Sequence, residues 1–333
     1  MYAAVYDRQQ ALAETAGLRQ AGTMKVATIC AVLLFALGPY VLAQEAREPI
    51  IDVHLHTHPA NRFGTVGVPN PVTGRPSAAM TDQALLDAAL AQMRRYNIVP
   101  AVGFSDRQSV ERWRNGAAGR IIGGMQIDQG IAGTRIGELR RDITQGSVRV
   151  IGEIGAQYLG LAPSDPILEP YLSLAEELDV PVGFHTGIAS PNTPLECCPK
   201  FRIPLGNPAL IEDVLIRHPK LRVYLMHAGR PFLEETIALM SVYPQVYADI
   251  SAIDWIITRD EFYAYVRALI RAGLEKQLMF GSDQMIWPES IGVAVETVQS
   301  IPGITESQKR DIFYNNAVRF FRLNERDLKP WQH

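Results

Sequence analysis

Eight apolar, β-branched segments recur along the chain, and a helical pattern follows most of them. Such alternation predicts parallel strands joined by crossover helices. We expect strands at 50–55, 97–104, 120–127, 148–154, 181–186, 222–227, 246–250 and 278–282. We expect helices at 82–96, 107–115, 136–145, 168–178, 207–217, 232–243, 260–272 and 290–300. Eight strand–helix units indicate an α/β fold that closes into a (β/α)8 barrel, the TIM barrel.

The length of the chain fits one such barrel with short additions. Its 333 residues compare with about 250 for an ordinary barrel. We expect a single domain at 49–323 and a C-terminal tail at 324–333. Segment 306–323 should pack as a closing helix against the outside of the barrel. The connection 59–80 after the first strand is long and rich in proline and glycine, which predicts a wall or lid over the strand ends.

The N-terminal region, residues 1–43, has the features of an extension and a signal peptide. Met24-Lys25 precedes an apolar stretch that ends with Val41-Leu42-Ala43, a small-x-small pattern typical of export cleavage. Cleavage after Ala43 predicts a periplasmic or extracellular protein without stable membrane insertion. The alternative is an uncleaved N-terminal membrane anchor, because the 18 residues before Gln44 approach the length of a membrane span.

Two adjacent cysteines, Cys197 and Cys198, remain once the signal peptide with Cys30 is removed. Neighbouring Cα atoms lie about 3.8 Å apart, less than a disulfide usually spans. The pair is therefore either two thiols in a loop or a strained, labile disulfide beside the active site.

The charge distribution argues against a nucleic-acid partner. Lysine and arginine total 32 against 35 acidic residues, a formal net charge of −3, and no basic run stands out. We expect a small-molecule substrate, and the oligomeric state is open, with a homo-oligomer as one possibility.

Potential metal ligands end five of the expected strands. They are His54, His56, Glu153, His185, His227 and Asp283. In a barrel the carboxyl ends of all strands open at one mouth, so these side chains should converge. His54 and His56 are two residues apart on one strand and point to the same face, where they can bind one ion together. Imidazole and carboxylate ligands suit a divalent transition metal, with zinc favoured and manganese or iron as alternatives.

Other polar side chains near the mouth have less defined roles. Glu153 is either a metal ligand or a partner for a histidine N–H. His58 is a candidate for support behind the ligands, whereas His218 lies at the opposite end and should be structural. The arginines among the substrate candidates could clamp a carboxylate or phosphate, although a surface ion pair is equally expected. The substrate candidates are Arg62, Arg230, Tyr158 and Trp287.

With these residues in place, the chain resembles the amidohydrolase superfamily, specifically the amidohydrolase-related (amidohydrolase 2) metal-dependent TIM-barrel proteins. The resemblance covers about 49–323. It rests on Asp52-Val53-His54-Leu55-His56, Gly152-Glu153-Ile154-Gly155, Phe184-His185-Thr186-Gly187, His227-Ala228-Gly229, Gly281-Ser282-Asp283 and Tyr314-Asn315-Asn316-Ala317. It implies that the catalytic metal is held by His54, His56, His185 and Asp283. His227 would bind a second metal or contact the substrate.

Glu153 departs from part of the superfamily. Phosphotriesterase and dihydroorotase types carry a carboxylated lysine at the end of strand four, whereas a glutamate there is similar to the TatD-type nucleases, in which it bridges two metals. A single metal suffices in the decarboxylase branch. The sequence therefore leaves one or two ions open.

The resemblance implies a metal-dependent hydrolase with Asp283 and His227 as catalytic residues. Metal binding lowers the pKa of the bound water far below its ordinary value, toward about 7. Asp283 would orient that water and pass its proton to the leaving group, while His227 polarises the substrate oxygen. The expected target is an ester, lactone, amide or phosphoester. The alternatives are a non-oxidative decarboxylase, similar to aminocarboxymuconate-semialdehyde decarboxylase, and a non-catalytic barrel that binds a metal or ligand.

Overall fold

The computed structural model of the protein describes residues 47–127, 135–187, 189–329 and 331. Within them, eight strands form one parallel sheet in chain order. They are β1 (Ile50–His56), β2 (Ile98–Ser105), β3 (Ile121–Ile127), β4 (Val150–Ile154), β5 (Val182–His185), β6 (Val223–Met226), β7 (Val246–Asp249) and β8 (Leu278–Met279). The last strand returns to the first, because the Val53 N–H donates to the Phe280 carbonyl at 2.9 Å. The predicted (β/α)8 barrel is confirmed.

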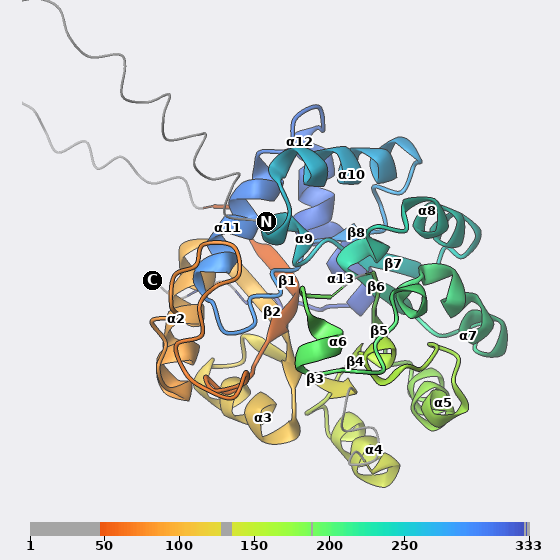
Figure 1. The fold of residues 1–333 in the computed structure, drawn as a ribbon, viewed down its shortest axis with the longest axis horizontal. Coiled ribbons are helices and arrows are strands. Elements are labelled where there is room, and N and C mark those ends of the chain that lie inside the picture. Colours follow the sequence, from red (N-terminus) through yellow and green to blue (C-terminus); the bar gives the residue numbers. More distant parts are fainter. Residues whose placement is uncertain (1–46, 128–134, 188, 330, 332–333) are drawn as a thin grey trace, which may run out of the picture. The chain divides into compact units, whose positions relative to one another are not determined.

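Helices surround the strands (Figure 1). Those that follow the strands as crossover helices are α2 (Asp82–Arg95), α3 (Arg107–Gly116), α4 (Ile136–Thr144), α5 (Glu169–Glu177), α7 (Glu212–Arg217), α8 (Leu233–Val242), α10 (Arg259–Arg271) and α11 (Glu289–Gln299). The additional helices are α6 (Thr193–Glu196), α9 (Ile253–Ile256), α12 (Glu306–Arg310) and α13 (Asn316–Phe321). Side-chain caps fix some of the starts: the Thr81 hydroxyl accepts from the Ala84 N–H, and the Asp106 carboxylate accepts from Ser109.

Two boundaries differ from the sequence prediction for local reasons. The helix expected over 207–217 opens with a 3-10 turn, Pro208–Ile211, because Asn207 caps Ala209 and proline occupies the first position. Strand β8 is shorter than expected. The chain turns toward β1 after Phe280, and the N–H groups of Ser282 and Asp283 both point to the His54 carbonyl.

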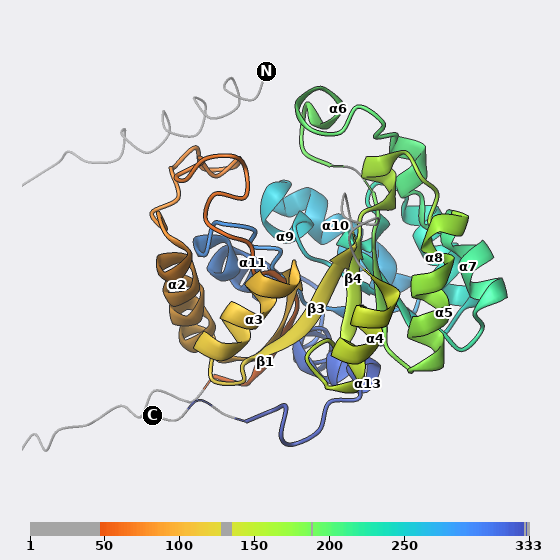
Figure 2. The same ribbon diagram turned by 90° about the horizontal axis from the view of Figure 1, so that it is seen from below.

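The C-terminal helix packs differently from the prediction. One core cluster joins buried side chains of β1, β2, β3, β4, β6 and β8 with Phe320 and Phe321 of α13. Because these strands lie on different sides of the barrel, their side chains can meet only in its interior. The Phe320 ring lies 5.5 Å from that of Tyr224. Helix α13 thus covers the end of the barrel opposite α6 (Figure 2), and the expectation that segment 306–323 packs against the outside was wrong for α13.

Two segments rise over the other end of the barrel, the connection 59–80 and the segment that carries α6 (Figure 2). The first is fastened to the residues after β8. The Trp287 indole N–H donates to the Val68 carbonyl at 2.9 Å, and the Ser77 hydroxyl donates to the Ile286 carbonyl at 2.9 Å. Segment 59–80 therefore forms an anchored wall.

The expected signal peptide at 24–43, like its membrane-anchor alternative, falls outside the described residues and stays a prediction. Among the helices that the structure does describe, none combines the length and apolarity needed to span a bilayer.

Phe320→Ala should destabilise the protein, because it leaves a cavity in the core cluster between α13 and the strands. The Phe320 side chain is 3% exposed, and removing such a ring costs about 3–5 kcal/mol of unfolding free energy. Urea denaturation measures the effect. Ile216→Ala is the control: Ile216 is 66% exposed and should change stability by less than about 0.5 kcal/mol. Equal effects of the two substitutions would contradict the packing.

Candidate active site

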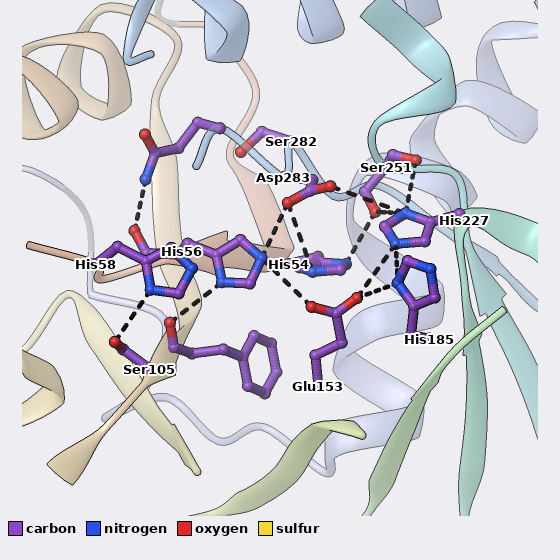
Figure 3. A network of polar contacts seen from close by, with 12 residues as sticks. His54, His56, His58, Ser105, Glu153, His185, His227, Ser251, Ser282 and Asp283 are labelled. Carbon is purple, nitrogen blue, oxygen red and sulfur yellow. Dashed lines mark hydrogen bonds and ion pairs between the residues drawn. The ribbon is translucent and has the colours of Figure 1, made fainter. Parts of the chain in front are cut away.

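The residues expected to converge do so, at the carboxyl ends of the strands, and all are buried. Figure 3 shows Glu153 rising between two groups of histidines, with Asp283 opposite it. His54 and His56 come from β1 and Glu153 from β4. His185 ends β5, while His227 and Asp283 follow β6 and β8.

His54, His56 and Asp283 form the first cluster. The Asp283 Oδ1 lies 3.0 Å from the His56 Nε2 and 3.8 Å from the His54 Nε2. None of these three buried atoms has hydrogen-bond geometry toward any partner. A buried polar atom without a partner carries a desolvation cost of about 1–3 kcal/mol. Three such atoms aimed at one point are what a bound cation would satisfy.

Glu153, His185 and His227 form the second cluster. The Glu153 Oε1 is bonded to the His185 Nδ1 and lies 3.4 Å from the His227 Nε2. Its other oxygen, Oε2, lies 3.6 Å from the His56 Nε2 in the first cluster. The two oxygens of one carboxylate therefore face two different clusters.

Two of the site residues have a backbone conformation that is unusual for residues other than glycine. His227 has φ 63° and Asp283 has φ 45°. Such left-handed positions cost about 1–3 kcal/mol and persist only where the surroundings enforce them. Here the His227 N–H donates to the Asp249 carboxylate at 3.0 Å, and the Asp283 N–H donates to the His54 carbonyl at 2.6 Å. The turn after each strand thereby directs its side chain into the mouth.

Asp249 and Ser251 also belong to the site and were not predicted from the sequence. The Asp249 Oδ2 lies 3.1 Å from the His54 Nδ1. The Ser251 hydroxyl lies 2.9 Å from the same nitrogen and 3.1 Å from the His227 Nδ1. These contacts hold the Nδ1 side of His54 and leave its Nε2 for a cation. A signal existed, since Asp249 ends a predicted strand just as the assigned ligands do.

Supporting contacts also surround His56. Its Nδ1 lies 3.3 Å from the Phe104 carbonyl, and the His58 ring stacks on it with centroids 4.3 Å apart. The His58 Nδ1 lies 3.1 Å from the Ser105 hydroxyl, and burial holds the pKa of His58 well below its usual value. His58 thus lies behind the ligands as a neutral ring.

The buried charges at the mouth compensate one another. Burial lowers the pKa of His54, but the carboxylates of Asp249 and Asp283 outweigh burial and raise that pKa to about 10. Burial raises the pKa of Glu153, and the neighbouring His185 and His227 outweigh it, so that the pKa lies well below its usual value. The buried histidines and carboxylates of the mouth therefore stabilise one another's charged forms.

Of the four substrate candidates, Tyr158 contacts the ligand clusters directly. Its hydroxyl lies 3.3 Å from the His185 Nε2. Trp287 is buried after β8 and stacks on Phe63 of segment 59–80, with centroids 5.6 Å apart. Arg230 pairs with Glu261 at 3.8 Å, and Arg62 is exposed in segment 59–80.

His218, which the sequence predicts to be structural, lies away from the mouth. The two ring nitrogens of His218 lie 2.9 Å from Glu169 and 3.1 Å from Glu176. Its polar atoms face α5 carboxylates, as expected for a structural role.

A family model described as "Amidohydrolase" matches residues 51–323. The chain belongs to the amidohydrolase family. Membership supports a metal-dependent enzyme of hydrolase type over the alternative of a non-catalytic barrel. Protein fluG of Emericella nidulans is 24% identical over 160 residues, which cover 44% of this chain and 18% of fluG. The chain thus spans less than a fifth of that relative.

Solved structures share the fold at low identity. A probable 2-pyrone-4,6-dicarboxylic acid hydrolase from Acinetobacter baumannii has a TM-score of 0.58 and 16% identity, covering 82% of this chain and 99% of its own. 2,6-Dihydroxybenzoate decarboxylase has a TM-score of 0.57 and 14% identity, covering 83% and 99%. An amidohydrolase from Burkholderia multivorans with bound zinc has a TM-score of 0.57 and 15% identity, covering 83% and 99%.

Asp249→Asn should weaken metal binding by about 10- to 100-fold, the usual cost of losing a partner behind a ligating histidine. An amide N–H₂ facing the His54 Nδ1 would force the ring proton onto Nε2, the atom needed for the cation. Competition with a chromogenic chelator measures the affinity. Asp87→Asn, an exposed aspartate of α2, is the control and should leave the affinity unchanged. If both variants bound metal like the native protein, Asp249 would have no such role.

Proposed function

We propose that this amidohydrolase uses water to cleave an ester, lactone, amide or phosphoester bond in a small molecule. The reaction would depend on one or two bound divalent cations, with zinc as the favoured metal. The observation that carries the proposal is the position of Glu153, whose two carboxylate oxygens face separate clusters. Paired cations suit the addition of water to a carbonyl or phosphoryl group.

In the first cluster the donor set fits a divalent cation, because the His54 Nε2, His56 Nε2 and Asp283 Oδ1 atoms are buried and lack hydrogen-bond partners. The residues that would hold cations are His54, His56, Glu153, His185, His227 and Asp283. A bound cation would supply acidity to water and polarise the substrate.

The chain itself would move the proton through Asp283. The Asp283 Oδ1 faces the first cluster, and Oδ2 lies 4.0 Å from the His227 Nδ1. A carboxylate in this position can accept a proton from water and deliver it to the leaving group. His227 lies next to the Asp283 carboxylate and would stabilise the substrate oxygen. Tyr158, beside His185, would contact the substrate at the same mouth.

Non-oxidative decarboxylation is the second candidate. It is favoured by the first cluster, because His54, His56 and Asp283 could hold one cation without the second cluster. It is also favoured by fold neighbours that include 2,6-dihydroxybenzoate decarboxylase and 5-carboxyvanillate decarboxylase. In that reaction Asp283 and His227 would protonate the carbon that loses carbon dioxide.

The two reactions can be separated with one set of compounds. The metal-loaded protein is incubated in ¹⁸O-water with aryl esters, γ-lactones, 2-pyrone-4,6-dicarboxylate and 2,6-dihydroxybenzoate. Hydrolysis places ¹⁸O in the acid product, whereas decarboxylation releases carbon dioxide without labelling the organic product. Release of carbon dioxide together with inert esters and lactones would overturn the hydrolase proposal.

Asp283→Asn should lower kcat by about 10²- to 10⁴-fold, the usual contribution of a general acid–base group, with a smaller loss of bound metal. The amide keeps the shape of the side chain but cannot accept the proton from water. Metal content and kcat are measured on the same preparation, with Asp87→Asn as the matched control. Full activity in Asp283→Asn would remove Asp283 from the chemistry.

A further inference from the structure

A disulfide joins the adjacent residues Cys197 and Cys198, just after α6. Nothing in the proposed reaction uses it. The segment that carries it leaves β5 directly after His185 and lies over the mouth of the barrel (Figures 1 and 2). Of the two expectations for this pair, the structure has the bonded form.

The short Cα separation of this disulfide and the exposure of Cys197 make it open to reduction. Its Cα atoms are 3.8 Å apart, whereas disulfides usually span about 4.4–6.8 Å, and bonds outside that span are more easily reduced. Cys197 is exposed, while Cys198 is only 4% exposed. An incoming thiolate can therefore reach the Cys197 sulfur and displace that of Cys198.

The segment that carries the disulfide is hydrogen-bonded to the barrel at its base. The Gly187 N–H donates to the Gly206 carbonyl at 2.8 Å, and the Gln157 amide donates to the Gly187 carbonyl at 3.1 Å. Near the tip, Leu195 is 87% exposed. Opening the disulfide can therefore loosen the tip while the barrel stays intact.

A short series of contacts leads from the disulfide to the second cluster. The Phe201 N–H donates to the Cys198 carbonyl at 2.8 Å, and the buried Phe201 ring lies 5.4 Å from that of Tyr158. The Tyr158 hydroxyl in turn lies 3.3 Å from the His185 Nε2.

The backbone of the same segment also packs against the turn that carries Tyr158. A Cβ atom on Gly160 would lie 2.9 Å from the Lys200 carbonyl oxygen. The position of Tyr158 therefore depends on that of 198–201.

We propose that Cys197 and Cys198 form a reversible redox site whose state sets the position of Phe201 and Tyr158 at the mouth. The reductant is an external dithiol. One of its thiolates attacks the Cys197 sulfur, Cys198 leaves as a thiolate and takes up a proton, and the second thiol of the reductant resolves the mixed disulfide. Two electrons pass to the pair, the reductant becomes a disulfide, and two cysteine thiols result.

The first test needs no substrate. The metal-loaded protein is compared before and after dithiothreitol by thiol titration under denaturing conditions and by hydrogen exchange with mass spectrometry. We expect two new thiols per chain at 197 and 198 and exchange at least about fivefold faster in peptides covering 190–203 and 156–161. Oxidised glutathione should reverse both changes.

Two variants assign the effect. Cys197→Ser/Cys198→Ser should show the fast exchange permanently and ignore dithiothreitol, which also controls for removal of metal by the reductant. Phe201→Leu should keep the thiol change but lose the response of 156–161, because the contact with Tyr158 is cut.

Activity gives a separate readout. Unlike the thiol and exchange measurements, it rests on the proposed function. Reduction should change kcat/KM at least about fivefold in the native protein and leave the double serine variant unaffected. Free thiols that oxidised glutathione cannot pair, or unchanged exchange in 156–161 after reduction, would overturn the redox proposal. If the metal-loaded protein cleaves none of a panel of esters, lactones, amides and phosphoesters, the proposed function fails, while the exchange result still decides the redox site.

Discussion

The burial of ionisable side chains at one end of the barrel is the constraint on which the site depends. Glu153, Asp249 and Asp283 are almost fully withdrawn from water, together with four histidines. A buried carboxylate is tolerated only beside opposite charge or hydrogen-bond donors. The barrel satisfies this requirement by converging its strand ends, and it leaves unpaired the few atoms that face a cation. Stability and metal affinity are therefore two consequences of one arrangement.

The strands and the convergence of the candidate ligands could be predicted from local pattern, because a buried parallel strand is a continuous apolar run and its polar terminus stands out. Asp249 ended such a run, yet its role emerges only from its distance to His54 across the barrel. The interior position of α13 was also missed. An aromatic pair such as Phe320 and Phe321 indicates burial, but sequence does not say on which side of a sheet.

The two segments at the mouth differ in how they are held. Segment 59–80 is bonded to the residues after β8 by Trp287 and Ser77 and gives a fixed wall. The segment after β5 is bonded at its base and carries its own covalent constraint, the disulfide, near an exposed tip. Substrate specificity and redox regulation can thus reside in separate loops, while the candidate catalytic residues lie at the ends of the strands.

The most direct test of the account is the metal content of the purified barrel, measured by plasma mass spectrometry after reconstitution with zinc, manganese or iron. Because Glu153 faces both clusters, we predict about two ions per chain. About one ion would keep the metal site, make Glu153 a supporting residue and bring decarboxylation level with hydrolysis. The absence of bound metal after reconstitution would contradict the central claim.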